Sequence, residues 1–107
     1  MTAYEHIVVF RFGQPLPPEV TADLLSALLA FREEIPGILA LSAGVNDTLE
    51  TQNVHGYTLG LRITFRDREA LRAYQPHPSH LAFVRRLDGL LLDGLLQNVV
   101  VVDYPLV

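Results

Sequence analysis

The stretch "YTLGLRITF", residues 57–65, decides the fold, because apolar and polar side chains alternate along it. Successive side chains of a β-strand point to opposite faces of the sheet, so this alternation predicts a strand with one buried face. The predicted buried face carries Tyr57, Leu59, Leu61, Ile63 and Phe65.

The segments on either side alternate between strand and helix patterns. β-Branched and aromatic runs predict strands, whereas leucines at spacings of three and four, opened by proline or aspartate, predict helices. The expected strands are 5–12, 38–46, 57–65 and 98–107, and the expected helices are 19–35, 67–75 and 77–96.

This order is β-α-β-β-α-α-β, a ferredoxin-like pattern with one helix divided in two. We expect an α+β fold with one four-stranded antiparallel sheet and all helices on one of its faces. The 107 residues suffice for one domain with a core, so we assign residues 1–107 to a single domain.

Both faces of the sheet are predicted to be apolar. In "HIVVFRF" (6–12), His6, Val8, Phe10 and Phe12 share one face while Ile7 and Val9 lie on the other, and "VVVV" (99–102) is apolar on both. Helices on one face leave the second face uncovered, and an identical chain related by a two-fold axis would cover it. We therefore predict a homodimer that packs sheet against sheet.

Composition argues against several classes of function. The net charge is −4 and no basic run is present, so we expect no nucleic-acid partner. The absence of cysteine excludes disulfides and thiolate sites. No segment has the ~20 apolar residues of a membrane span, and the first residues lack the basic start of a signal peptide. We expect a soluble, cytoplasmic protein without a membrane partner.

The stretch "YQPHPSH" (74–80) places three groups that exchange protons close together. His80 shares a helical stripe with Val84, Leu87 and Leu91, so its imidazole is expected to point inward, where burial keeps it neutral and basic. The phenol of Tyr74 is a donor at neutral pH and could hold a carbonyl oxygen. The alternative is structural: a histidine that satisfies backbone groups at a helix start, and a tyrosine that only packs.

Five stretches, taken in order, resemble the stress-responsive dimeric α+β barrel (Dabb) family: "HIVVFRF", "IPGI", "GYTLGLRITF", "YQPHPSHLAFV" and "VVVVDY". The family includes stress-associated proteins and a plant polyketide cyclase, olivetolic acid cyclase, which works without cofactor or metal. The resemblance implies that His80 and Tyr74 are the catalytic pair and that His6 lines the same pocket. It implies no cofactor and no metal.

Three further residues are assigned to the pocket, Leu59 and Leu28 by the resemblance and Tyr57 by its position at the start of the predicted core face of 57–65. Leu59 stands where the cyclase has a histidine and Leu28 where it has a tyrosine, so a different substrate is expected. Tyr57 either lines the pocket mouth or packs in the core. His77 is expected to cap a helix rather than bind metal, and His55 to lie in a polar loop without a chemical role.

Three functions follow as alternatives. The first is cofactor-free acid–base chemistry, of lyase, cyclase or isomerase type, on a small apolar carbonyl compound. The second is a non-catalytic, dimeric stress-associated protein or ligand carrier. The third is a cofactor-free monooxygenase, which rests on analogy of fold alone.

Overall fold

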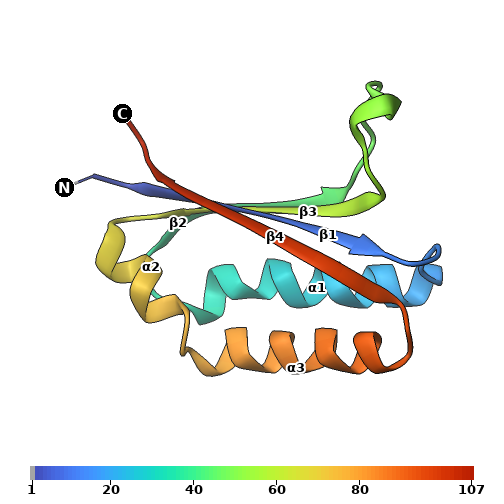
Figure 1. The fold of residues 1–107 in the computed structure, drawn as a ribbon. Coiled ribbons are helices and arrows are strands. Elements are labelled where there is room, and N and C mark those ends of the chain that lie inside the picture. Colours follow the sequence, from blue (N-terminus) through green and yellow to red (C-terminus); the bar gives the residue numbers. More distant parts are fainter. Residues whose placement is uncertain (1) are drawn as a thin grey trace.

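The computed structural model describes residues 2–107 and confirms the predicted fold class. Four antiparallel strands form one sheet in the order β2-β3-β1-β4, and three α-helices lie on one face of it (Figure 1). The elements are β1 (Tyr4–Phe12), α1 (Pro18–Glu34), β2 (Ile38–Val45), the 3₁₀ helix η1 (Thr51–Asn53), β3 (Tyr57–Phe65), α2 (Arg68–Tyr74), α3 (Pro78–Leu92) and β4 (Leu96–Pro105). Within residues 2–107, every helix is too short or too polar to span a bilayer.

The core lies between the sheet and the helices, as the alternation predicts. Leu59, Leu61, Ile63 and Phe65 of β3 are each at most 4% exposed. Val8 and Phe10 of β1, which pair with Leu61 and Leu59, are also buried. Helix α1 contributes Leu24, Leu28 and Phe31 to the same core.

The last helix ends four residues earlier than the sequence predicts. Gly94 adopts φ +75°, its N–H bonds the carbonyl of Leu91, and the N–H of Leu95 bonds the carbonyl of Leu90. These two bonds satisfy carbonyl groups in the last turn of α3, which have no partner within the helix. A glycine in the left-handed conformation commonly ends a helix in this way. Because the chain turns here, Leu96 joins β4 opposite Phe12 instead of continuing the helix.

The turn between α1 and β2 depends on a glycine. Gly37 has φ +86°, and a Cβ added there would lie 2.5 Å from the Cβ of Ala70. We expect Gly37→Ala to lower the free energy of unfolding by about 2–3 kcal/mol, because the left-handed conformation and the clash both oppose alanine. Urea denaturation measures this change.

Gly89→Ala is the matched control, because Gly89 lies inside α3 with no atom within 4 Å of an added Cβ. Alanine in place of a helical glycine should stabilise by about 0.5–1 kcal/mol. Equal stability of Gly37→Ala and the parent chain would show that the turn tolerates a side chain.

The face of the sheet away from the helices, here the open face, is uncovered, and it is apolar along the middle of β1 and along β4. The register places Ile7 and Val9 of β1 beside Val100, Val102 and Tyr104 of β4 on this face. The three β4 side chains are 42–52% exposed. The connection between β2 and β3 rises from the same side (Figure 1).

Candidate functional site

A cavity of about 370 Å³ lies between the helical face of the sheet and the helices. We call it the histidine cavity. Its polar lining consists of His6, Tyr74, Gln75, His80 and Asp88. The rest of its wall is apolar and is formed by Val8, Phe10, Leu28, Leu61, Phe83, Val84, Leu87, Leu96, Val99 and Val101. This volume and this mixture of apolar wall with a few polar groups are typical of small-molecule sites.

Helix α3 places His80 in its first turn. Pro78 is the first residue of the helix, and His77 caps it, with its Nδ1 accepting a hydrogen bond from the N–H of Ser79 at 3.1 Å. The Nδ1 of His80 lies 2.9 Å from the carbonyl oxygen of Gln75. A carbonyl oxygen only accepts, so Nδ1 carries the proton and the lone pair remains on Nε2. His80 is therefore presented as a neutral base.

Tyr74 ends α2 and is buried, with 2% of its surface exposed. Its ring centroid lies 4.3 Å from that of His80 and 5.2 Å from that of His6. Burial raises the pKa of the Tyr74 phenol well above its ordinary value, and the negative charge of Asp103 raises it further. The phenol therefore keeps its proton at every physiological pH and can only act as a donor or a neutral acceptor.

His6 is held by a carboxylate that sequence reasoning missed. Its imidazole is buried, and its Nδ1 lies 2.5 Å from the Oδ1 of Asp103 on β4. The carboxylate accepts a hydrogen bond from the Nδ1–H group. This bond fixes the orientation of the ring and leaves Nε2 free. The available signal was weak: Asp103 is the one charged residue in the closing run "NVVVVDYPLV", and antiparallel pairing of the first and last strands places it opposite His6.

The pH response of His80 follows from its surroundings. Burial lowers the pKa of His80 below its ordinary value of 6.5, and a proton on His6 would lower it as well, against the opposing effect of the hydrogen bond that His80 donates to the Gln75 carbonyl. We expect an NMR titration of the His80 ring to have its midpoint below pH 6.5.

The same shift has a consequence for stability. Above about pH 6.5 the ring is neutral in both folded and unfolded chains, so it contributes no pH dependence. As the pH falls below that value, the unfolded chain takes up the proton first, and the stability of the fold decreases until the folded-state pKa is passed. His80→Asn should reduce this acid-side slope. A midpoint at or above 6.5 would contradict the inferred environment.

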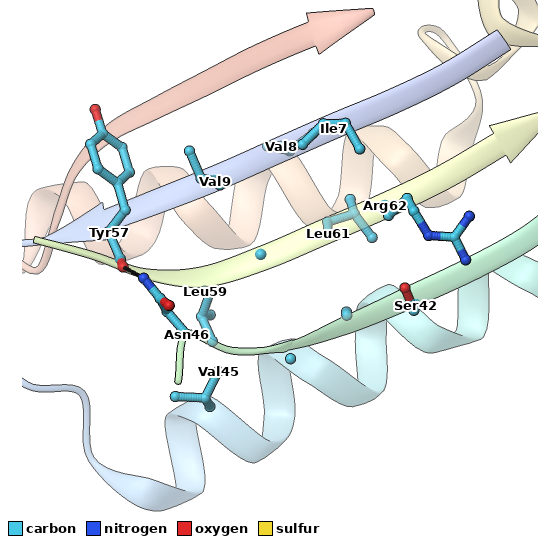
Figure 2. A pocket seen from close by; sticks show the side chains of 13 residues that line it. Ile7, Val8, Val9, Ser42, Val45, Asn46, Tyr57, Leu59, Leu61 and Arg62 are labelled. Atoms are coloured by element: carbon cyan, nitrogen blue, oxygen red, sulfur yellow. Dashed lines mark hydrogen bonds between the residues drawn. The ribbon is translucent and has the colours of Figure 1, made fainter. Parts of the chain in front are cut away.

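Two residues expected in the pocket lie elsewhere, and one lies where it was expected. Leu28 of α1 lines the histidine cavity. Tyr57 and Leu59 instead line a hollow of about 500 Å³ on the open face of the sheet, shown in Figure 2 with Ile7, Val9 and Arg62. For Tyr57 the reason is register: the pairing of β1 with β3 shifts between Phe10 and Arg11, so Tyr57 lies opposite Arg11 instead of continuing the core face that Leu59 and Leu61 share.

The remaining histidines are separate from the cavity. His77 caps α3, as expected. His55 lies exposed in the β2–β3 connection with φ +47°. Within residues 2–107, no group of three His, Cys, Asp or Glu side chains could hold a metal ion.

Comparison with known proteins places the chain in a family. The sequence matches the family described as "Stress responsive A/B Barrel Domain" over residues 4–106. It is 29% identical over 101 residues to the stress-response A/B barrel domain-containing protein HS1 of Arabidopsis thaliana. The aligned region covers 94% of this chain and 86% of HS1.

Two solved structures illustrate the range of similar folds. A dimeric ferredoxin-like protein of Jannaschia sp. CCS1 is 27% identical, with a TM-score of 0.73 and coverage of 97% of this chain and 99% of that chain. Hydroxynitrile lyase from Passiflora edulis is 16% identical, with a TM-score of 0.80 and coverage of 98% and 94%. The second likeness shows the fold alone. With the family match over residues 4–106, these findings establish that the chain belongs to the stress-responsive A/B barrel domain family.

Proposed function

We propose that the histidine cavity binds a small, largely apolar carbonyl compound, and that His80 and Tyr74 catalyse cofactor-free acid–base chemistry on it. The observation that carries this proposal is the packing of a neutral imidazole, with its Nε2 lone pair free, against a buried phenol that keeps its proton, in one apolar cavity. A base beside a hydrogen-bond donor is what proton removal next to a carbonyl group requires.

The proposed step moves one proton. The Nε2 of His80 takes a proton from the carbon next to the carbonyl group, and the C–H electron pair forms the enolate. The Tyr74 hydroxyl donates a hydrogen bond to the oxygen on which the negative charge develops. The enolate then attacks an electrophile, expels a leaving group or is reprotonated, which gives the cyclase, lyase or isomerase outcome.

His6 is proposed to line the same site rather than to act as the base. Its Nδ1 is engaged by Asp103, and its ring contacts the Tyr74 ring edge-on at 5.2 Å. The free Nε2 can accept a hydrogen bond from a ligand. The carboxylate of Asp103 fixes the orientation of that acceptor.

Deuterium exchange tests the proposal without knowledge of the natural substrate. In D₂O, the protein should accelerate replacement of the methyl protons next to the carbonyl group of 4-phenylbutan-2-one, followed by NMR. Exchange no faster than that caused by an equal concentration of free imidazole would overturn the catalytic role.

Binding of the ketone without exchange would favour the second candidate, a non-catalytic ligand carrier. In a carrier, His80 and Tyr74 would have structural roles. His80 donates a hydrogen bond to the Gln75 carbonyl, and the Tyr74 ring packs against Phe31 and Phe65. Saturable shifts of cavity resonances would then occur in the absence of turnover.

We also propose that two copies pack through the open face. Its apolar side chains on β1 and β4 are left uncovered by the helices, and the ferredoxin-like protein of Jannaschia sp. CCS1 is described as dimeric. Burial of such a face is a strong driving force for association, because apolar area removed from water contributes about 25 cal/mol per Å².

A further inference from the structure

One charged side chain breaks the apolar pattern of the cavity wall. On α3 the residues that line the cavity follow one helical stripe: His80, Phe83, Val84, Leu87 and Asp88. The inward-facing positions of such a stripe are normally apolar. Asp88 lies at the exposed edge of the stripe and is the one carboxylate that lines the cavity.

Asp88 lies far from the proposed acid–base pair. A helix rises 1.5 Å per residue, so His80 and Asp88 are separated by about 12 Å along α3. The cavity therefore has one polar end at His6, Tyr74 and His80, an apolar middle, and a carboxylate at the other end. Asp88 is exposed, which places it at the mouth.

No cation balances this carboxylate. Asp88 takes part in none of the ion pairs formed within residues 2–107, and no arginine lines the cavity. The nearby Arg86 pairs with Asp23 of α1 instead. A ligand that fills the cavity would bring its far end to an unpaired negative charge.

We infer that Asp88 sets the class of ligand: a carbonyl compound with an apolar middle and, at the end away from the carbonyl group, a hydroxyl or a cationic group. This inference rests on the proposed function of the cavity. A hydroxyl or a cation at the far end of the ligand would form a charge-assisted hydrogen bond with the Asp88 carboxylate. A carboxylate at that end would be repelled by Asp88, and the apolar wall beside it would weaken this repulsion less than water does.

Four matched ketones test the inference by binding alone. 4-Phenylbutan-2-one and its para-hydroxyl, para-aminomethyl and para-carboxylate derivatives are titrated into the protein at low salt, and dissociation constants are taken from NMR shifts. The aminomethyl ketone should bind roughly tenfold more tightly than the carboxylate, because attraction of one and repulsion of the other each contribute a factor of about two to five at a half-exposed site.

Variants identify the residue responsible. In Asp88→Asn and Asp88→Leu, the ratio of the two dissociation constants should fall to about twofold or less. Asp47→Asn makes the same chemical change on the exposed β2–β3 connection and should keep the parent ratio. A ratio that Asp88→Asn leaves unchanged, with all four ketones bound, would overturn the role of Asp88 and leave the proposed function standing. Failure of all four to bind would overturn both.

Discussion

Replacing His80 with asparagine is expected to slow ketone deuterium exchange by about 100- to 10,000-fold, the range that a positioned general base contributes. Asparagine keeps a group that can donate to the Gln75 carbonyl but has no basic nitrogen. The variant should therefore retain its fold and its affinity for 4-phenylbutan-2-one while the exchange rate falls. NMR rates at saturating ketone separate the two effects.

His55→Asn provides the matched control. It makes the same substitution outside the cavity, at a residue with φ +47° where asparagine is well tolerated. Tyr74→Phe should also slow exchange, because it removes the donor for the developing enolate but keeps the ring. If His80→Asn exchanged the ketone at the parent rate, His80 would not be the base.

The second large effect concerns assembly. Val100→Asp places a carboxylate on the edge strand β4, opposite Val9 of β1 on the open face. If this face is buried between two copies, each copy carries an unpaired charge into the interface, which costs several kcal/mol. We expect the dimer dissociation constant to rise by at least about 100-fold, measured by sedimentation equilibrium.

Folding of the single chain should change little, because Val100 is already 42% exposed there. Leu92→Asp is the control, since Leu92 ends α3 on the helical side and is 89% exposed. A parent chain that stays monomeric, or a Val100→Asp variant with an unchanged dissociation constant, would contradict the proposed interface.

Local patterns predicted the fold because they depend on neighbours in the sequence. The alternation from residue 59 to residue 65 indicates directly which side chains are buried. Leu59, Leu61, Ile63 and Phe65 are all buried in the structure. The end of α3 was misplaced because Leu95 and Leu96 continue the apolar pattern, whereas the turn is set by the conformation of Gly94.

The site was predicted only where one segment carries it. Tyr74 and His80 lie six positions apart, so their proximity was visible in the sequence, and a single strand face indicated the inward direction of His6. Asp103 was missed because its contact with His6 spans 97 residues and depends on strand pairing. Leu59 was placed at the pocket by resemblance, which does not fix where along the strand the cavity ends. Tyr57 was placed there by the alternation of 57–65, which the register shift between Phe10 and Arg11 interrupts.

Residues 2–107 form several hollows, and the acid–base pair lines the histidine cavity. The histidine cavity lies between the sheet and the helices, whereas the hollow of Figure 2 lies on the open face, beside Tyr57, Val45 and Arg62. A ligand bound in the hollow of Figure 2 would have no contact with His80. The location of a bound ketone is therefore the point on which the proposed chemistry depends.

Intermolecular NOEs to bound 4-phenylbutan-2-one measure that location directly. The histidine-cavity site predicts NOEs from the ketone methyl group to the ring protons of Tyr74 and His80, and from its phenyl ring to Val84 and Leu87. NOEs to Val45 and Tyr57, with none to Tyr74 or His80, would contradict the account.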